Sequence, residues 1–461
     1  MEHIKRLKEY PLENRSHWDD LPLVSVIVIS YNNFHFLVHS VRSVLEQEYP
    51  RLELTVSDDA SAGYTDSRGA FLVCKAVRSI LVERKFMELE ETTGRSEQKQ
   101  REKAEKRILE EEFDLDKDYL QEARELIHTH FPQIQNLRFN KNRTNLGTVK
   151  HLKGLKENAQ GKYLMFLAAD DMLHDKKVIY DMITRFESLP EDAYVLSSQC
   201  GMYDFELKQL RYFAVNDHIK KILLESTPKQ LFAELTDWCL VPAAGTIYKK
   251  TVFQKFGDLD PRYHLIEDWT YFLKLTRSGA KIYYYDRLTY MHRDGGISHG
   301  NTTGGSDAYL HYLDDWILLT ETEILPYLNE VTPKQRKQAL KRYRDAVRER
   351  EWKYRFRNMS GAGKLRFLFR YWPHYTAKMM KSVGDFVNYR AKWAFICSVL
   401  LLFLYSFCSL VDRPQSPPLQ VFETVIGFCG LLLLIGTVLS KILCYIFKLA
   451  AKIYARLKRE D

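Results

Sequence analysis

Residues 23–59 read LVSVIVISYNNFHFLVHSVRSVLEQEYPRLELTVSDD. The run at 23–30 is almost unbroken in its apolar character, which is typical of a parallel strand buried on both faces. Residues 34–48 then place apolar side chains at helical spacing, and a second apolar run at 52–57 leads into two aspartates. A strand, a helix and a second strand of these lengths predict a βαβ unit with two parallel strands.

The alternation of strand and helix resumes further along the chain. Apolar runs predict strands near 137–140 and at 163–168, and helical spacing predicts a helix over 148–158. This alternation is typical of an α/β sheet. Residues 70–131 interrupt it with many Glu, Lys and Arg side chains, some at i,i+4 spacing. We interpret them as a solvated helical insertion at the edge of the sheet rather than as a partner-binding element.

Composition excludes several classes of protein. The chain has 461 residues, of which 45% are hydrophobic and 28% charged, so it can bury a core and is not wholly disordered. Its 21 Gly and 14 Pro are too few for a collagen-like or low-complexity chain. The 7 Cys contain no CxxC pair, which argues against a disulfide framework or a zinc site. The first residues hold no apolar run, so no secretory signal is expected.

The net charge of +8 hides a strong asymmetry along the chain. Residues 331–392 contain about 18 Lys and Arg against about 4 Asp and Glu, whereas the first 330 residues carry a net charge of about −9. An acidic body therefore precedes a basic neck. Because this neck adjoins the most apolar part of the chain, anionic lipid is its expected partner. Nucleic acid is not, since no nucleic-acid-binding motif accompanies the cations.

Two apolar runs follow the neck, at 393–411 and at 419–439, and the second extends toward 447. Each is long enough to cross a hydrocarbon core of about 30 Å as a helix, and the prolines between them predict a turn. Lys and Arg flank the pair on both sides, while the connecting loop holds only Arg413. The positive-inside rule then predicts a two-pass membrane hairpin with both flanks in the cytosol. A buried soluble hairpin is the alternative, which the lack of a charged face disfavours.

These patterns predict five parts of the chain. They are an N-terminal extension at 1–20, an α/β domain at 21–330, a basic juxtamembrane helical region at 331–392, a transmembrane hairpin at 393–447 and a basic cytosolic tail at 448–461.

Pairs of carboxylates follow two of the predicted strands. Asp58 and Asp59 come after the strand at 52–57, and Asp170 and Asp171 come after the strand at 163–168. Open α/β sheets bind ligands at the carboxyl ends of their parallel strands. Two acidic pairs there suit a hard divalent cation and a nucleotide. Neither a GxxxxGK[ST] nor a GxGxxG motif follows a strand, so carboxylates and a metal would have to hold the phosphates.

A third acidic pair, Glu267 and Asp268, opens an apparent helix that runs to Arg277. Two interpretations are equally open from the spacing alone. The carboxylates either complement the dipole of the helix N-terminus or supply a general base.

Six short motifs in register resemble bacterial family 2 glycosyltransferases of the GT-A fold. They are VSVIVISYN at 24–32, VSDDAS at 56–61, NLGT at 145–148, LAADD at 167–171, EDW at 267–269, and YMHR at 290–293 followed by GIS at 296–298. The resemblance covers about 21–301 and is interrupted by the charged insertion. It implies a GT-A Rossmann-like sheet, a nucleotide-sugar donor that is usually UDP-linked, and a divalent cation, Mn²⁺ or Mg²⁺.

The resemblance also implies roles for single positions. The residues implied to contact the nucleotide-sugar are Ser30, Tyr31, Asn32, Asp58, Asp59, Asn145, Gly147, Ala169, Arg293 and Ser298. Those implied at the metal are Asp170, with Asp171 and His299. Asp268, beside Glu267, would remove the proton from the acceptor hydroxyl in a single displacement that inverts the anomeric carbon. Ala168 stands where the family's Asp-x-Asp-Asp motif has its first Asp. The ribose or metal contact that this Asp makes in the family would be lost, replaced by water or taken over by Asp59.

The expected function is that of a membrane-tethered transferase that acts on a lipid-linked saccharide in cell-surface polysaccharide assembly. It would lie in the bacterial inner membrane with the catalytic domain and both termini cytoplasmic, and the sequence leaves a homo-oligomer open. A polyprenyl-phosphate glycosyltransferase and an inactive scaffold of the same fold are the alternatives. A processive, exporting polymerase is disfavoured, because two spans are too few and no Gln-x-x-Arg-Trp motif is present.

Overall fold

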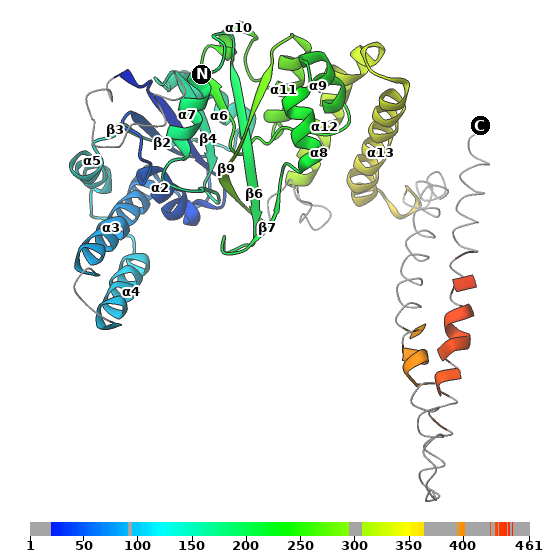
Figure 1. Ribbon diagram of the computed structural model, residues 1–461, viewed down its shortest axis with the longest axis horizontal. Coiled ribbons are helices and arrows are strands. Elements are labelled where there is room, and N and C mark those ends of the chain that lie inside the picture. Colours follow the sequence, from blue (N-terminus) through cyan, green and yellow to red (C-terminus); the bar gives the residue numbers. More distant parts are fainter. Residues whose placement is uncertain are drawn as a thin grey trace, which may run out of the picture. The chain divides into compact units, whose positions relative to one another are not determined.

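The computed structural model describes residues 20–90, 95–294 and 307–363, together with short pieces between 394 and 445. Its first unit is built on a central sheet with helices on both faces (Figure 1). The contacts divide the chain into two units, Met1–Tyr354 and Arg355–Asp461, and the sheet belongs to the first.

The predicted βαβ unit is confirmed. Strand β1 (Val24–Ser30) leads through a short 3₁₀ turn, η2 (Phe34–Phe36), into helix α2 (Leu37–Leu45) and strand β2 (Leu52–Asp58). β1 and β2 pair in parallel along their whole length. Both strands are almost wholly buried, as the two apolar runs predicted.

Nine strands form one mixed sheet in the order β3-β2-β1-β4-β8-β6-β9-β5, with β7 paired to β6. The half that contains β1 is parallel, and β8 introduces antiparallel pairing with both β4 and β6. The α/β sheet is therefore confirmed in its first half, while the second half is not parallel throughout. The remaining strands are β3 (Ile134–Lys141), β4 (Tyr163–Ala168), β5 (Met172–Leu173), β6 (Val195–Tyr203), β7 (Leu210–Phe213), β8 (Ile247–Lys249) and β9 (Ile282–Arg293).

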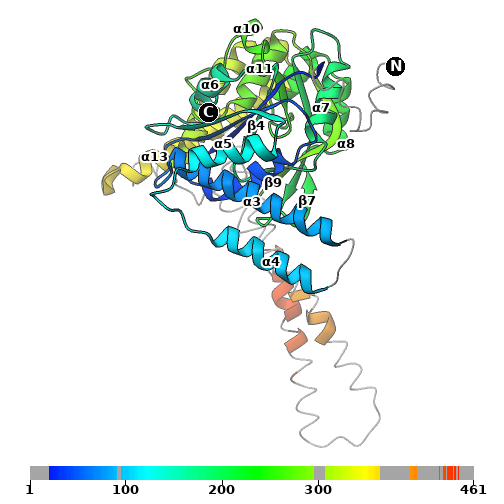
Figure 2. The same ribbon diagram turned by 90° about the vertical axis from the view of Figure 1, so that its left-hand side faces the viewer.

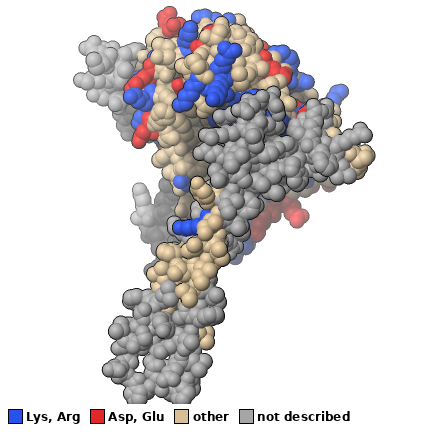
Figure 3. Space-filling model, turned by 90° about the vertical axis from the view of Figure 1, so that its right-hand side faces the viewer, with Lys and Arg blue, Asp and Glu red and all other residues tan. Residues whose placement is uncertain are grey.

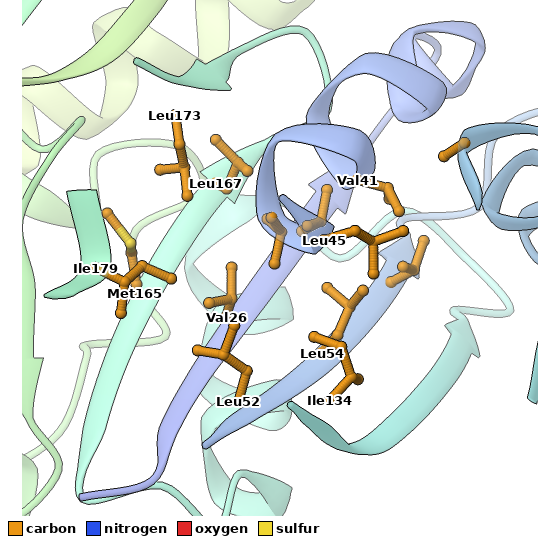
Figure 4. Close-up of a cluster of buried hydrophobic side chains, with 14 of the residues drawn as sticks. Val26, Val41, Leu45, Leu52, Leu54, Ile134, Met165, Leu167, Leu173 and Ile179 are labelled. Carbon is orange, nitrogen blue, oxygen red and sulfur yellow. The ribbon is translucent and has the colours of Figure 1, made fainter. Parts of the chain in front are cut away.

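Two apolar cores lie on opposite faces of the sheet. Val26 and Val28 of β1 point into one core, whereas Ile27 between them points into the other, as the two-residue period of a strand requires. Figure 4 shows the first core, where Val26 and Leu54 lie beneath Val41 and Leu45 of α2, and Met165 lies beside Ile179. Each such side chain, when fully buried, stabilises the fold by about 1.5–3 kcal/mol.

The helices divide between these cores. Helices α2, α3, α5 and α7 pack on the first core, and α6, α9 and α11 on the second. Their bounds are α3 (Asp66–Glu90), α4 (Arg95–Glu110), α5 (Tyr119–His130), α6 (Thr148–Asn158), α7 (Val178–Glu187), α8 (Asp217–Glu225), α9 (Pro228–Leu235), α10 (Val252–Lys255) and α11 (Asp268–Arg277). They are followed by α12 (Asp307–Leu319), the π-turn η4 (Thr320–Ile324), the 3₁₀ turn η5 (Leu325–Glu330) and α13 (Pro333–Asn358).

The charged insertion differs from the prediction at its start. Helix α3 buries Ala70, Val73, Cys74 and Val77 completely, so its first half belongs to the core rather than to a solvated excursion. These apolar residues recur at i, i+3, i+4 and i+7, a stripe that the high average charge of the segment concealed. Only the outer half of α3 and helix α4 project from the sheet (Figures 1 and 2).

The predicted membrane hairpin lies mostly outside the described residues. Within the described part of the chain, no helix combines the length and the apolar character needed to cross a bilayer. The extension before residue 20, the neck beyond 363 and the tail at 448–461 also lie outside it.

Candidate active site

The carboxyl ends of β1, β2 and β4 meet at one edge of the sheet. Ser30 lies opposite Asp58 on the neighbouring strand, and Ile29 lies opposite Ala168. The two predicted acidic pairs therefore follow β2 and β4, the two parallel strands that flank β1, at the edge where such sheets bind ligands.

Asp58 ties the first two strand ends together. It is wholly buried, and it accepts hydrogen bonds from Ser30 Oγ at 2.6 Å, from Ser61 N at 2.6 Å and from Ser61 Oγ at 2.7 Å. Ser61 Oγ in turn accepts from the backbone N–H of Asn32, which holds a left-handed conformation with φ 58°. Asp58 thus holds Ser30 and the loop at Ser61 in place from the interior. This role differs from the nucleotide contact predicted for it.

Tyr31 and Ala169 lie at the same edge in contrasting environments. Tyr31 is 47% exposed, and its backbone N–H donates to Asn33 Oδ1 at 3.0 Å. Ala169 is fully buried and donates its N–H to Ile29 O at 2.8 Å. Of the two, only Tyr31 has an exposed side chain, whereas the Ala169 side chain packs in the interior.

Asp59 organises the loop that leads into α6. It is 3% exposed and accepts hydrogen bonds from Asn142 Nδ2 at 2.8 Å, from Leu146 N at 2.9 Å and from Gly147 N at 2.9 Å. Asn145 Oδ1 also accepts from Gly147 N, at 2.8 Å. The structure therefore brings Asp59, Asn145 and Gly147 together, as predicted. Asp59 uses much of its acceptor capacity on the protein itself.

Asp171 is an internal anchor of the second acidic pair. It is 2% exposed, accepts from the backbone N–H of Arg293 at 3.0 Å and lies 2.8 Å from His292 Nδ1. Burial pulls the pKa of His292 down, but the Asp171 carboxylate outweighs burial, so that this pKa is raised. The contact between His292 and the Asp171 carboxylate thus fixes the end of β9 against the end of β4.

Asp170 is the member of this pair with the more ligand-like environment. Burial, and after it the charge of Asp171, raises the pKa of Asp170, while a hydrogen bond with Asn33 acts in the opposite direction. When a half-buried carboxylate lies next to a second carboxylate, a nearby cation stabilises its charged form.

Arg293 lies beside Asp170, but it is held by the protein. Its Nε donates to the backbone oxygen of Asp170 at 2.8 Å, and its Nη1 donates to the backbone oxygen of Phe205. The guanidinium also lies 4.2 Å from the centre of the Phe36 ring. Arg293 is therefore a fixed positive charge at the site, and part of the donor fork predicted to face a diphosphate is already engaged.

A divalent cation fits this chemistry if a substrate completes its coordination. Among the described residues, no group of three His, Cys, Asp or Glu side chains could hold a metal alone, and Ala168 supplies no ligand. Mg²⁺-type ions are usually held by one or two carboxylates together with substrate phosphates and water. Asp170 meets that requirement. Ser298 and His299, the other residues predicted near the diphosphate, lie outside the described residues.

Glu267 and Asp268 open α11, as predicted, and both are half-buried. Burial, and after it the charge of Asp268, raises the pKa of Glu267 to about 8. Burial also raises the pKa of Asp268. Asp268 Oδ1 accepts from Trp269 N at 2.7 Å, and Oδ2 lies 4.0 Å from Cys239 Sγ. Burial therefore favours the protonated form of both acids, and carboxyl groups with raised pKa values are suited to proton transfer.

His264 connects this pair with the Gly147 loop. A Cβ on Gly147 would lie 2.5 Å from His264 Nδ1, and His264 O accepts from Val149 N at 3.3 Å. The predicted nucleotide side and the predicted base are thus joined through one loop only three residues long, 264–266.

Helix α12 contributes residues that sequence reasoning missed. Asp315 accepts backbone hydrogen bonds from the loop 264–266, and the His311 ring lies 4.4 Å from the His264 ring. Burial, and after it the Asp268 charge, raises the pKa of Tyr312. No motif could have revealed Asp315, because its partners are backbone N–H groups some fifty residues away.

Comparison with known proteins agrees with the first part of the site. The family model for glycosyl transferase family 2 matches residues 25–68, which contain β1 from its second residue, α2, β2 and the Asp58–Asp59 pair. No curated protein matches the chain.

Solved structures give distant likenesses. TarS from S. aureus, residues 1–349 in complex with UDP-GlcNAc, shares 15% identity over 79% of this chain and 81% of that chain, with a TM-score of 0.41. In another TarS crystal structure the match spans only 48% of that chain. The mannosyltransferase PcManGT from Pyrobaculum calidifontis, in complex with GDP-Man and Mn²⁺, shares 12% identity over 95% of this chain and 92% of that chain, with a TM-score of 0.39.

Proposed function

We propose that this chain is an inverting, metal-dependent glycosyltransferase. It moves a sugar from a nucleotide-sugar, most simply a UDP-sugar, to a lipid-linked saccharide in cell-surface polysaccharide assembly. The observation that carries the proposal is the joining of two sites by one loop. The strand edge with Asp59, Gly147 and Asp170 contacts, through His264, the loop that ends in the Glu267–Asp268 pair.

The donor binds, in this proposal, at the strand edge. Tyr31 offers an exposed ring beside the nucleoside, and Asp59 fixes the Gly147 loop that borders it. Asp170 would hold Mn²⁺ or Mg²⁺ together with the donor's diphosphate. When bound, that cation neutralises the negative charge that develops on the departing nucleoside diphosphate. Arg293 adds a positive charge that the protein holds in place through the Asp170 and Phe205 carbonyls.

Asp268 acts as the general base on the acceptor side. It takes the proton from the acceptor hydroxyl as that oxygen bonds to the anomeric carbon and the bond from this carbon to the diphosphate oxygen breaks. One displacement inverts the anomeric centre, and no carboxylate nucleophile is needed. Glu267 stays protonated as long as Asp268 is charged, because that charge adds to burial in raising its pKa.

An exposed tryptophan near this base supports a saccharide acceptor. Trp238 is 59% exposed, and the next residue, Cys239, contacts Asp268. The Trp238 ring lies 6.5 Å from that of Trp269, whose indole N–H is held by Leu235 O at 2.8 Å. An exposed aromatic face of this kind can bind the apolar face of a sugar ring and leave its hydroxyl groups to polar neighbours.

Membrane attachment rests on the sequence and on the charge of α13. The apolar runs at 393–411 and 419–439 would form a two-pass anchor in the bacterial inner membrane, with the catalytic unit and both termini in the cytoplasm. Figure 3 shows Lys and Arg side chains among Asp and Glu side chains on the described part of one face. Cations of α13 and the following neck would attract anionic lipid, by about 1 kcal/mol for each one near the surface.

A panel assay tests the proposed function. Full-length protein in detergent is incubated with UDP-glucose, UDP-galactose, UDP-GlcNAc or GDP-mannose, with and without a membrane lipid extract, and nucleotide release is measured. We expect release from one donor to depend on Mn²⁺ or Mg²⁺ and to rise when the extract is present. An Asp268→Asn variant should lose the extract-dependent part. No release from any donor, or release that Asp268→Asn leaves intact, would reject the proposal.

A further inference from the structure

Asp315 sits on α12 with its carboxylate directed at the loop before the catalytic pair. It is 4% exposed and accepts backbone hydrogen bonds from three successive residues. His264 N lies 2.8 Å from Oδ1, Leu265 N lies 2.5 Å from Oδ2, and Ile266 N lies 3.0 Å from Oδ2. The next residue along the chain is Glu267.

Three consecutive N–H groups that converge on one anion fix the backbone between them. Charge-assisted hydrogen bonds of this kind are shorter and stronger than neutral ones. Because the site is buried, replacement of the carboxylate leaves at least one of these N–H groups without an equivalent acceptor. The conformation of 264–266, and with it the start of α11, therefore depends on Asp315.

The same loop also contacts the donor side. The ring of His264 lies against Gly147, whose own N–H is held independently by Asp59 at 2.9 Å. Asp315 thus holds a segment that touches the Gly147 loop and leads directly into the Glu267–Asp268 pair. Loss of Asp315 would move the acid pair while leaving the Gly147 loop attached to Asp59.

We propose that Asp315 is a positioning residue for Asp268, and this inference rests on the proposed glycosyl transfer. Asp315 holds the loop 264–266 so that the Asp268 carboxylate stands within reach of the acceptor hydroxyl when the donor is bound. It acts through the backbone of the loop and contacts no substrate. The transfer rate then depends on Asp315, while nucleotide affinity does not.

The chain offers a matched control in the preceding residue. Asp314 lies on the same helix with its side chain 45% exposed, and it pairs with Arg350 Nε at 2.7 Å. Asp314→Asn and Asp315→Asn make the same chemical change one residue apart, and only the second removes an acceptor from the loop.

Hydrogen exchange in the full-length protein tests the clamp without any substrate. Amides in a peptide that spans 264–268 should exchange faster in Asp315→Asn than in the native protein, and at the native rate in Asp314→Asn. If Asp315→Asn does not yield folded protein, Asp315→Glu keeps the charge and displaces it by one methylene, and it should show the same change. Unaltered protection in the folded variant would overturn the inference.

Kinetics then separate positioning from general stability. With the donor identified in the panel, kcat of Asp315→Asn should fall about 10- to 100-fold, because a displacement of about 1 Å has that effect. The Kd for UDP with Mn²⁺, measured by calorimetry, should stay within about 2-fold of the native value, as should every value for Asp314→Asn. A native kcat, or a loss of UDP affinity equal to the loss of kcat, would overturn the inference. Full activity of Asp268→Asn would instead reject the proposed function, and the exchange result on Asp315 would stand.

Discussion

Gly147 and His264 lie so close that a Cβ on Gly147 would sit 2.5 Å from His264 Nδ1 and 2.6 Å from His264 O. Gly147 also has φ +78°, a conformation that L side chains rarely adopt. Two independent constraints therefore require glycine where the loop before α6 meets the loop 264–266.

Gly147→Ala should displace one of these two loops. We expect UDP affinity to fall at least about 10-fold and transfer to fall with it, because the strained residue can no longer satisfy Asp59 and avoid His264 together. Calorimetry with UDP and Mn²⁺ measures the first effect. Gly154→Ala is the matched control: Gly154 lies inside α6 with open space around it, and alanine there should stabilise the fold by about 0.5–1 kcal/mol. Equal affinity for UDP in both variants would contradict the assigned role of Gly147.

Asp170→Asn should remove the carboxylate that would hold the divalent cation. We expect turnover to fall at least about 100-fold, since several kcal/mol of charge stabilisation are lost, while the melting temperature changes little. Nucleotide release across a Mn²⁺ titration is the measurement. Asp116→Asn, in the exposed turn before α5, provides a control carboxylate at which activity should be unchanged. Native activity of Asp170→Asn, or full activity of the native protein in excess EDTA, would contradict metal dependence.

Asp268→Asn and Glu267→Gln should separate the base from its neighbour. General base catalysis contributes about 10²- to 10⁴-fold, so we expect a loss of that size for Asp268→Asn, with the Kd for UDP unchanged. Glu267→Gln should be milder, because glutamine imitates the protonated acid that burial already favours. Steady-state kinetics with calorimetry measure both. Equal losses in the two variants would leave Asp268 without a special role, and a loss of UDP affinity in Asp268→Asn would move it to the donor side.

The sequence could predict which residues lie at the edge of the sheet, because the apolar runs define the strands and the aspartates directly follow them. The apolar runs before Asp58 and Asp170 fix two buried parallel strands, and parallel strands bring their carboxyl ends together. What the residues do at that edge was less predictable. Asp58 and Asp171 carry the same side chain as Asp170, yet both accept hydrogen bonds from distant segments, Asp58 from Ser30 and Asp171 from Arg293.

Long-range backbone contacts explain the other differences. The Asp315 carboxylate accepts from the His264 N–H, which lies 51 residues away in the sequence. That N–H is a backbone group that every residue type except proline carries, so no side-chain pattern marks it. β8 contains only 3 residues, too few for a periodic pattern, yet it reverses the direction of pairing in the sheet. Local sequence therefore predicted the strands and helices in the first half of the sheet, whereas tertiary contacts determine the strand pairing in its second half.

Glu267 should also make the stability of the fold depend on pH. Burial, and after it the Asp268 charge, raises the pKa of Glu267 from 4.5 to about 8. Between these values the native state keeps a proton that the unfolded chain has released, so the free energy of unfolding falls as pH rises across this window. The stabilising contribution is complete below the lower value, where both states are protonated, and it is lost above the upper one.

Glu267→Gln removes this dependence, because glutamine stays neutral at every pH. We expect the melting temperature of the native protein to fall by several degrees more than that of the variant between pH 5 and pH 8.5, measured by calorimetry at constant ionic strength. Glu206→Gln is the matched control: the Glu206 side chain is 65% exposed and pairs with Lys208, so its melting curve should follow that of the native protein. Parallel curves for the native protein and Glu267→Gln would mean that Glu267 is ionised in the folded state. Asp268 would then share its site with a second negative charge instead of a proton.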